Sequence, residues 1–368
     1  MLHKEYHMKN ITVTLPTPKA ADYSIYVGAG ALQKIGELYD LGSYSKLFVI
    51  ADEGVQPLLE KLLAVLPGDT VSLILPAGEQ AKHIQTVEKI WTALHAAGCD
   101  RKSLVINLGG GVVGDLGGFA ASTYMRGLDF LNVPTTLLSQ VDASVGGKTG
   151  FNFDGVKNLI GTFSHPVSVV IDPSVLKALP ERQFLSGFAE IIKHGLIWDK
   201  EHLEEATRKL PQQFSQDELT AIIVRSCQIK VEILTSDVTE RGPRKLVNFG
   251  HTIGHAIEVL SLDTNRPLTH GEAIAIGMVV EADISRRLSL LTPSEVNQIK
   301  ETFSKIGLLV PLPSLPISDV IEKTRSDKKN EGGKVNYTLL KAIGQALYDQ
   351  QVDESVVRAA LEAEMGAS

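Results

Sequence analysis

Cysteine is nearly absent from this sequence, since Cys99 and Cys227 are the only two among its 368 residues. Two cysteines build no disulfide framework, so the composition indicates a reducing compartment. Long apolar runs are missing as well: residues 1–17 have no apolar core of signal-peptide length, and no stretch approaches the roughly 18 residues that a membrane helix needs. The chain is therefore expected to be cytoplasmic and to have no membrane partner.

A large excess of charge of either sign is also missing. Lysine and arginine together number 36 against 43 acidic residues, which gives a formal net charge of −7. This balance argues against bulk binding of nucleic acid or of anionic membranes, although local basic clusters still matter. With 368 residues, the chain is long enough for two domains.

Two patterns of hydrophobicity divide the chain. In residues 46–171, short β-branched runs alternate with helical periodicity, which is typical of a parallel sheet covered by helices. Beyond residue 173, long helical stretches replace the β-branched runs. The sequence therefore predicts a Rossmann-like α/β domain over residues 1–173 and a mostly α-helical domain over residues 174–368. No Gly/Ser linker separates the halves, so we expect them to pack closely and to share a ligand-binding cleft.

The individual elements are expected as follows. Strands are predicted at 46–51, 70–75, 103–108 and 167–171, with helices at 55–66 and 83–97 between them. Residues 11–15 and 23–27 alternate like an antiparallel hairpin that flanks the sheet. In the second half, helices are predicted at 181–198, 217–236, 254–260 and 270–288.

A histidine pair stands out in the second half. His251 and His255 are four residues apart and so share one face of a helix, where they either bind a metal or find backbone and carboxylate partners. A third histidine, His270, and a carboxylate, Glu190, lie in other glycine-containing segments. Two imidazoles and one carboxylate with an open position are the ligands expected of a catalytic zinc, and such a site would also accept cobalt or other divalent ions.

A glycine-rich loop, residues 109–115 (GGGVVGD), lies between a predicted strand and an apolar helical segment. Gly109, Gly111 and Gly114 satisfy the pattern G-x-G-x-x-G, whose backbone amides cradle a pyrophosphate, although such glycines also serve tight turns. The loop follows about the third parallel strand instead of the first, so a nucleotide would bind in a variant of the usual dinucleotide fold. The turn at 77–82 offers a carboxylate for ribose hydroxyls beside a cation, or is simply a solvated loop.

Residues 145–149 (VGGKT) look like the end of a Walker A phosphate loop, but Asp142 stands where the first glycine would be and would repel the phosphates. We therefore reject an NTPase and retain Lys148 on a glycine-rich turn. Lys193 follows Glu190 by three residues, on the same side of a helix. These cations favour a substrate that is anionic and hydroxylated, as do Arg244 and Asn248, which are four residues apart just before His251.

In their order and their amino-acid sequence, these segments resemble the 3-dehydroquinate synthase family of the shikimate pathway. The resemblance covers about residues 77–344. The segments that carry it are 109–115, 133–138, 141–149, 157–161, 187–195, 248–255, 270–278 and 327–329.

The resemblance implies roles for individual residues. Zinc would be bound by Glu190, His251 and His270. NAD would be bound by Asp52, Glu79, Lys82, Gly111, Val112, Val113, Gly114, Asp115, Thr135, Thr136, Lys148 and Lys157. The catalytic residues would be Lys148, Lys193, Arg244, Asn248 and His255, the last as a substrate contact and proton-transfer candidate. The substrate would also meet Asp142, Asn158, Lys230 and Lys328, with Arg126 reaching in from the partner subunit of a homodimer.

Two positions depart from the family pattern on the cofactor side. Gly54 stands where the family often has Asn after Asp52, and Ala178 stands where a Thr usually precedes Leu179. Each departure puts a single hydrogen bond to NAD in doubt and leaves the chemistry intact.

The activity implied by the resemblance is the conversion of 3-deoxy-D-arabino-heptulosonate 7-phosphate, a phosphorylated sugar acid, to 3-dehydroquinate and phosphate. This makes the chain a carbon–oxygen lyase of aromatic amino-acid biosynthesis. NAD would be reduced and reoxidised within one turnover, around phosphate elimination and before an intramolecular aldol closure.

Three alternatives stay open at this point. Another sugar-phosphate cyclase, of the 2-deoxy-scyllo-inosose or valiolone type, would use the same NAD and metal site, and Asn248 discriminates because the inosose enzymes tend to have an acid there. A metal-dependent polyol dehydrogenase of the glycerol dehydrogenase type would release NADH. A NAD- or phosphate-sensing module would bind these ligands without turnover.

Overall fold

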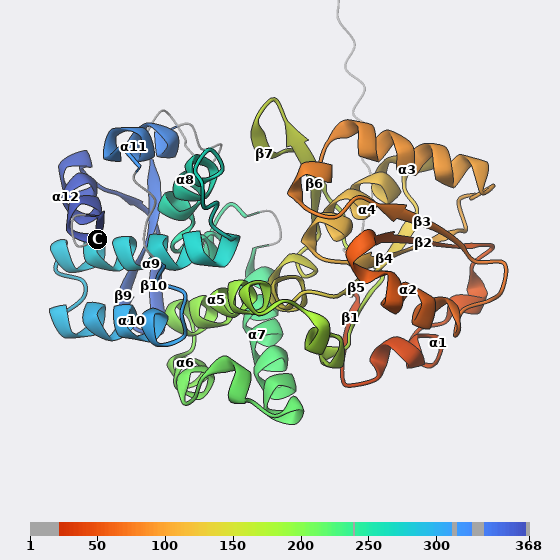
Figure 1. Cartoon of the computed structure of the whole chain (residues 1–368), viewed down its shortest axis with the longest axis horizontal. Coiled ribbons are helices and arrows are strands. Elements are labelled where there is room, and N and C mark those ends of the chain that lie inside the picture. The colour runs from red at the N-terminus through yellow and green to blue at the C-terminus, as the bar shows by residue number, and fades with distance from the viewer. Residues whose placement is uncertain (1–21, 238–239, 311–314, 326–334, 366–368) are drawn as a thin grey trace, which may run out of the picture.

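The computed structural model describes residues 22–237, 240–310, 315–325 and 335–365. These residues form two lobes, one built around a sheet and the other mainly of helices (Figure 1). None of the helices in the described part of the chain has the length and apolar character to cross a membrane. The two-part fold predicted from the sequence, α/β followed by mostly α, is confirmed.

Six parallel strands make the sheet of the first lobe, in the order β1-β8-β5-β4-β2-β3. The four predicted strands are confirmed to within about one residue. A strand that was not predicted, β5, has an apolar run broken by Asp129 and Asn132. The strands are β1 (Ser24–Val27), β2 (Leu47–Asp52), β3 (Val71–Leu75), β4 (Leu104–Gly109), β5 (Asp129–Pro134) and β8 (Ser168–Ile171).

Helices cover both faces of this sheet. Phe48 of β2 packs with α3 and α4 on one face, and the next residue, Val49, packs with α2 on the other. This alternation is the period of a strand, and it explains why the buried strands read as continuous apolar runs. The covering helices are α1 (Ile35–Leu38), α2 (Gln56–Leu63), α3 (Ile84–Ala96) and α4 (Gly111–Thr123).

Two further segments of this lobe bear on the predictions. An antiparallel hairpin, β6 (Lys148–Phe153) and β7 (Val156–Phe163), was not predicted and lies between the lobes at the top of Figure 1. Residues 24–27, expected in a flanking hairpin, form β1, which pairs in parallel with β8 at the edge of the sheet. The other half of that hairpin, residues 11–15, lies outside the described residues, so their pairing stays a prediction.

The second lobe contains the four helices predicted for it. They are α5 (Glu181–Ile197), α7 (Gln216–Ser236), α8 (His251–Ser261) and α9 (His270–Arg287), and α8 starts three residues before its predicted start at 254. The lobe also contains an antiparallel strand pair that was not predicted. The remaining elements are α6 (Lys200–Thr207), α10 (Pro293–Lys305), α11 (Ile317–Arg325), β9 (Asn336–Ala342), β10 (Gln345–Gln351) and α12 (Glu354–Met365).

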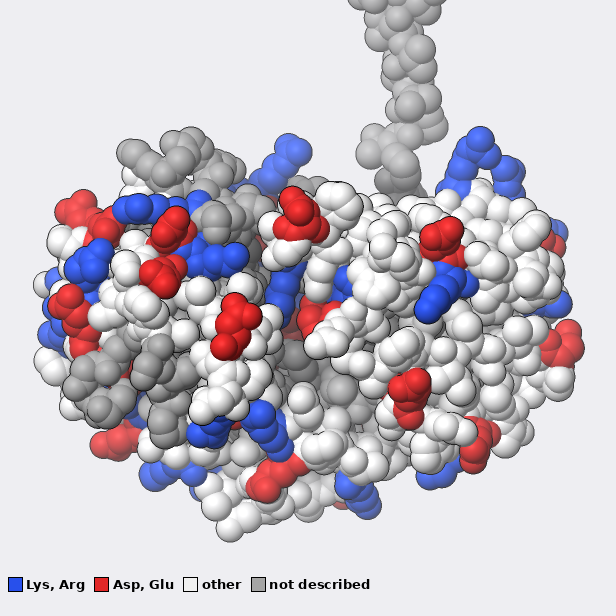
Figure 2. Space-filling model, turned by 45° about the horizontal axis from the view of Figure 1, so that its top comes forward, with Lys and Arg blue, Asp and Glu red and all other residues white. Residues whose placement is uncertain are grey.

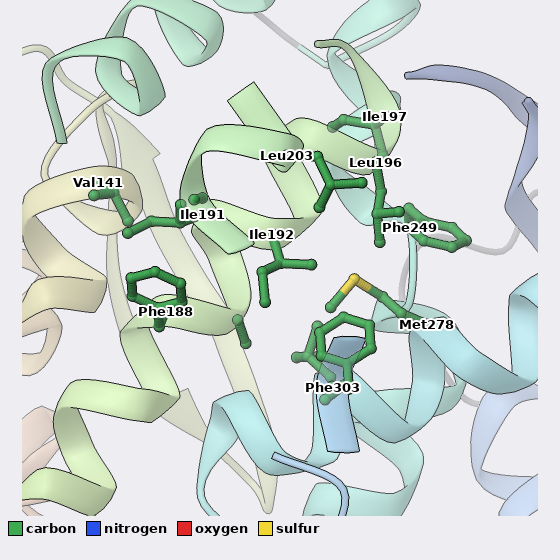
Figure 3. Close-up of a cluster of buried hydrophobic side chains, with 14 of the residues drawn as sticks. Val141, Phe188, Ile191, Ile192, Leu196, Ile197, Leu203, Phe249, Met278 and Phe303 are labelled. Atoms are coloured by element: carbon green, nitrogen blue, oxygen red, sulfur yellow. The ribbon is translucent and has the colours of Figure 1, made fainter. Parts of the chain in front are cut away.

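A shared hydrophobic core joins the lobes. Val169 and Ile171 of β8 belong to the same buried cluster as Phe188 and Ile191 of α5. Figure 3 shows Val141, from the segment after β5, beside Ile191 and Phe188. The close packing of the two halves that was expected without a linker is therefore present. Figure 2 shows the surface hollowed between the lobes, with acidic and basic side chains in the hollow.

Candidate active site

The residues predicted to bind a dinucleotide gather at the carboxyl ends of the parallel strands. Asp52 is the last residue of β2, and the turn with Glu79 and Lys82 follows β3. The glycine loop follows β4, and Thr135 and Thr136 follow β5. Because the carboxyl ends of parallel strands share one edge, these residues meet where α/β sheets bind their ligands.

The first two glycines of the loop have little room for a side chain. A Cβ on Gly109 would lie 2.5 Å from Cγ2 of Val113, and one on Gly110 would lie 3.2 Å from Cγ2 of Thr136. The loop leads directly into α4, whose first amides have no partner within the helix and attract anions. Beside it is a shallow recess, lined by Asn107, Gly109, Gly110, Gly111, Gly114, Asn132, Pro134, Ser139, Ala143 and Ser144.

Polar contacts link this edge of the sheet to the β6–β7 hairpin. Lys82, only 5% exposed, forms an ion pair with Asp115 at 2.5 Å. Burial alone would lower the pKa of Lys82, but the charges of Asp115 and Glu79 raise it. Asn152 donates from Nδ2 to Glu79 at 2.8 Å and accepts the backbone N–H of Asn158 at 2.8 Å. A predicted cofactor residue, Glu79, and a predicted substrate residue, Asn158, thus share one partner.

On the other lobe, three helices converge on a buried carboxylate. Glu190 lies in α5 and is fully buried, while His251 and His270 are the first residues of α8 and α9. Oε1 of Glu190 lies 3.7 Å from Nε2 of His251 and 3.5 Å from Nε2 of His270. One ligand atom from each of the three lies within 4.8 Å of the others, so the structure brings together the predicted metal ligands.

The start of α8 packs against the backbone of α9. A Cβ on Gly277 of α9 would collide with the carbonyl oxygen of Gly250, which precedes α8 in a left-handed conformation with φ of 79°. The buried carboxylate of Glu281 accepts the N–H of Gly250 at 2.6 Å and that of Ile253 at 3.3 Å. The positions of His251 and His270 are therefore set by the crossing of two helix backbones.

The protonation of these histidines fits a cation between them and Glu190. Nδ1 of His251 lies 3.1 Å from the carbonyl oxygen of Phe249 and donates a hydrogen bond to it, so Nε2 presents a lone pair toward Glu190. This lone pair and the negatively charged oxygen of Glu190 repel one another unless a proton or a metal lies between them. Burial alone would lower the pKa of His270, but Glu190 and Glu258 raise it to about 10. The three side chains therefore fit a divalent cation, the ligand set that the sequence predicted.

Two other groups of possible ligands have similar spacing. His255, Glu258 and His270 form one, in which Glu258 pairs with Lys157 at 2.8 Å and also faces His270. His255 itself lies beside the trio, with its ring centre 5.0 Å from that of His251 and 5.8 Å from that of His270. This placement agrees with a role next to the metal for His255.

The third group is Asp142, Glu190 and His194, and two buried lysines hold its carboxylates. Lys230 donates to Oδ1 of Asp142 at 2.5 Å, and Lys193 pairs with Oε2 of Glu190. The predicted placement of Lys193 beside Glu190 is confirmed. Burial and the charge of Lys193 lower the pKa of His194 to about 3, so this histidine, which was not predicted, is neutral.

Residues predicted to bind an anion lie between the hairpin and α8. Arg244, 3% exposed, donates from Nη2 to the carbonyl oxygen of Gly146 at 2.8 Å. Asn248 donates to Oε1 of Glu240 at 3.0 Å, and Lys148 forms an ion pair with Oε2 of Glu240. Glu240 was not predicted, and the only available signal was an acid beside the basic run at 241–245.

Two predicted residues are not brought to this cluster. Lys328 lies outside the described residues. Arg126 is exposed, with φ of 71°, and makes no ion pair with any residue of the described ranges. Its placement is compatible with a role on another subunit.

Comparison with known proteins identifies the family. Models of the 3-dehydroquinate synthase N-terminal and C-terminal regions match residues 72–186 and 187–330. The 3-dehydroquinate synthase of Acidithiobacillus ferrooxidans is 42% identical over 354 residues, which is 93% of this chain and 95% of the relative. The chain belongs to the 3-dehydroquinate synthase family. The enzyme of that name from Rippkaea orientalis is 40% identical over 361 residues, 95% of this chain and 97% of the relative. The family and the function predicted from the sequence are therefore confirmed.

Solved structures show the same architecture. A 2-deoxy-scyllo-inosose synthase complexed with carbaglucose-6-phosphate, NAD⁺ and Co²⁺ is 28% identical with a TM-score of 0.82, covering 92% of this chain and 96% of that one. A 2-epi-5-epi-valiolone synthase from Streptomyces hygroscopicus with NAD⁺ and Zn²⁺ is 28% identical with a TM-score of 0.84, covering 97% and 100%. A butanol dehydrogenase from Thermotoga maritima, 15% identical with a TM-score of 0.69 over 97% and 99%, shares the fold alone.

Proposed function

We propose that this chain converts 3-deoxy-D-arabino-heptulosonate 7-phosphate into 3-dehydroquinate and inorganic phosphate, as a carbon–oxygen lyase that depends on NAD and a divalent metal. The observation that carries the proposal is the meeting of Glu190, His251 and His270 in one lobe, together with a dinucleotide-type glycine loop at the sheet edge of the other. The NAD⁺ with Co²⁺ or Zn²⁺ in the two related cyclases supports both cofactors.

Each lobe would hold one cofactor. Glu190, His251 and His270 would bind the metal, and the glycine loop with Asp52 and Glu79 would bind NAD. When bound, the metal acidifies a substrate hydroxyl, and NAD accepts a hydride and later returns it. We also propose that the division between the two functional units falls near residue 174, because the sheet ends with β8 and α5 follows after a short connection.

The remaining residues would bind and orient the substrate. Arg244, Lys148 and Asn248 present cationic and amide donors on one side of the hollow, which suits the carboxylate and phosphate of the substrate. The N-termini of α8 and α9 add the positive ends of two helix dipoles. His255, next to both metal-binding histidines, would hold or move a proton at the phosphate-bearing end.

Further contacts come from residues around this position. Asp142, Asn158, Lys193 and Lys230 would fix the hydroxyl groups, with Lys328 assigned by family resemblance alone. Lys148 and Lys230 are paired with acidic residues in this structure. When the substrate binds, its groups would replace part of these contacts. Lys193 and Arg244 are almost fully buried, so little water surrounds their charges. This burial strengthens their interaction with an anion.

One assay tests the activity. The purified chain is supplied with zinc, a catalytic amount of NAD and the heptulosonate phosphate, and phosphate and NADH are both followed. Phosphate release without net NADH is expected, because hydride returns to the substrate within the turnover. Accumulation of NADH in step with product would instead indicate a polyol dehydrogenase. Release of phosphate from glucose 6-phosphate, and not from the heptulosonate, would indicate a cyclase of the inosose type.

We further propose a homodimer in which Arg126 of each subunit completes the partner's site. Phe153 and Phe163 of the β6–β7 hairpin are 50% and 52% exposed, which is unusual for large apolar side chains in a free surface. Oγ of Ser122 lies 3.0 Å from Oγ1 of Thr162, so this hairpin is tied to the segment that leads to Arg126.

Mixing two inactive variants tests the shared site. Arg126→Ala subunits and Lys148→Ala subunits, mixed equally and allowed to exchange, should regain up to about a quarter of the activity, since half the dimers are mixed and each then has one intact site. No recovery, with mixed dimers shown to form, would count against a shared site.

A further inference from the structure

Glu258 is a buried carboxylate that belongs to neither cofactor site proposed above. It lies on α8, seven residues after His251 and three after His255, so these three side chains share one face of the helix. The residue is only 8% exposed. A buried carboxylate without partners is costly, so its contacts indicate what it does there.

Each carboxylate oxygen of Glu258 faces a different lobe. Oε2 lies 3.4 Å from Nδ1 of His270, on the neighbouring helix α9. Oε1 accepts a hydrogen bond from Nζ of Lys157 at 2.8 Å. Lys157 belongs to β7, in the hairpin that lies next to α8 at the top of Figure 1. Glu258 therefore connects a histidine of the helical lobe to a lysine of the sheet lobe.

The contact with Glu258 decides which nitrogen of His270 is free for a metal. A carboxylate only accepts hydrogen bonds, so Nδ1 of His270 donates to Glu258, and Nε2, which faces Glu190, is the nitrogen left to bind a metal once its proton is displaced. His251 has the same arrangement, with the backbone carbonyl of Phe249 as the acceptor for Nδ1. Metal-binding histidines usually donate their second nitrogen in this way, which fixes the ring and makes the ligand more basic.

The two histidines differ in how firmly that acceptor is held. The carbonyl of Phe249 is part of the backbone, whereas the side chain of Glu258 has several rotatable bonds and needs a second anchor. Lys157 provides this anchor, and its side chain is 28% exposed. The orientation of His270 thus depends on a contact made across the two lobes.

We propose that Glu258 is a positioning residue of the metal site, which orients His270 through Nδ1 and is itself held by Lys157 of the opposite lobe. This inference rests on the proposed function, because it takes Glu190, His251 and His270 as the metal ligands. Glu258 is not a ligand in this arrangement, since both of its oxygens are engaged. A contact between the lobes then bears directly on how tightly the metal is bound.

Cobalt binding to the metal-free full chain tests this role without any turnover. Co²⁺ is titrated in, and its visible absorption reports both the affinity and the geometry of the site. Glu258→Gln should bind Co²⁺ about 10- to 100-fold more weakly, as expected for the loss of a partner behind a ligand, with an altered spectrum. Lys157→Met should cause a smaller loss. The double variant should bind no more weakly than Glu258→Gln, because Lys157 acts through Glu258.

Glu364→Gln is the matched control, because Glu364 also forms a lysine ion pair at 2.8 Å, with Lys300 far from the site. It should leave cobalt affinity unchanged, and the melting temperatures of the metal-free variants separate binding from folding. If Glu258→Gln binds Co²⁺ like the unmodified chain, the positioning role is wrong. If the effects of the two substitutions add, the link to Lys157 is wrong.

Two further outcomes are also decisive. Should Glu258→Gln fail to fold, Lys157→Met alone tests the arrangement, and an affinity equal to that of the unmodified chain overturns it. If the unmodified chain binds no Co²⁺, the metal-ligand assignment fails first, and the positioning role fails with it. Loss of binding confined to the Glu258 and Lys157 variants supports both the metal-ligand assignment and the positioning role.

Discussion

The two lobes supply their parts of the site by different means. The sheet lobe offers loops at the ends of β2, β3, β4 and β5, where the glycine loop exposes backbone amides and has little room for side chains at Gly109 and Gly110. The helical lobe offers buried side chains on α5, α8 and α9, whose positions follow from helix packing. Ligand binding on the sheet lobe therefore depends mainly on how closely a ligand can approach the backbone of the glycine loop. On the helical lobe it depends on charged side chains held at fixed distances from one another.

Buried charge shows the same difference. On the helical side, Glu190 and Lys193 are both almost fully inaccessible and neutralise one another. Burial alone would raise the pKa of Glu190, but the charge of Lys193 and the contact with His270 lower it, so the carboxylate is ionised. The glycine loop, by contrast, carries no charge up to Asp115. A substitution should thus affect chemistry on one side and cofactor affinity on the other.

The largest effect is expected from removing a metal ligand. Glu190→Gln or His270→Ala should lower turnover more than about 1000-fold, because a bound metal stabilises developing charge by several kcal/mol. Metal content, measured by atomic emission on the purified variants, should fall in parallel, while circular dichroism shows a retained fold. Glu301→Gln, on the exposed face of α10, is the control. A normal zinc content in either ligand variant would contradict the assignment.

A smaller effect is expected on the sheet side from Gly111→Ala. A Cβ there would meet Ala143 at 3.4 Å, an ordinary contact, so the fold should tolerate it. The methyl group would occupy the place where a pyrophosphate approaches the loop, and the NAD dissociation constant should rise about tenfold, which is about 1.4 kcal/mol. Calorimetric titration with NAD measures this, with Gly68→Ala, which has open space around it, as the control. An unchanged dissociation constant would place NAD elsewhere.

The smallest effect on the site itself is expected from a histidine of the helical lobe that lies outside it, where the change is in stability. His202 of α6 is 4% exposed, with Nε2 3.0 Å from Oγ of Ser226, and burial lowers its pKa to about 4. Between pH 6.5 and 4 the unfolded chain binds a proton that the folded chain does not. The folded state should therefore lose stability as the pH falls through this window, by at most about 1.4 kcal/mol per pH unit from this group, and show no such loss above it.

Urea unfolding at pH 7 and pH 5 checks this dependence. His202→Gln should lose less stability between the two pH values than the unmodified chain does. His95→Gln, on the exposed side of α3, should behave like the unmodified chain. Equal losses in the His202 and His95 variants would show that His202 is not the group responsible.

The fold was predictable where one type of periodicity continues over a whole element. β2 and β4 are buried on both faces and α5 and α9 are long, so their positions followed from the sequence. The β6–β7 hairpin was not predicted, because glycines such as Gly150 interrupt any alternating pattern. In the structure Gly150 lies against the backbone of Ile160, which only the paired strands reveal.

Spacing alone predicted contacts of the site only between residues that are close in sequence, whereas the trio of Glu190, His251 and His270 followed from the family resemblance. Glu190 and Lys193 share a helix face, and their pairing followed from a spacing of three. Glu240 and Glu258 were not predicted, because their roles depend on partners brought close only by folding, such as Lys157, which is 101 residues from Glu258. The i, i+4 spacing of His251 and His255 predicted a shared helix face, but it did not show which of the two histidines belongs to the metal-binding trio.

The contact between Gly277 and Gly250 limits how the metal site can be redesigned. Each metal-binding histidine starts a helix, and the two helices touch through glycines, so the distance between His251 and His270 depends on this contact. A larger residue at position 277 would push the helices apart and change that distance, instead of retuning one ligand. Variants with a different metal preference are therefore best sought by changing residues that contact Nδ1 of a metal-binding histidine, such as Glu258, while the helix crossing is left unchanged.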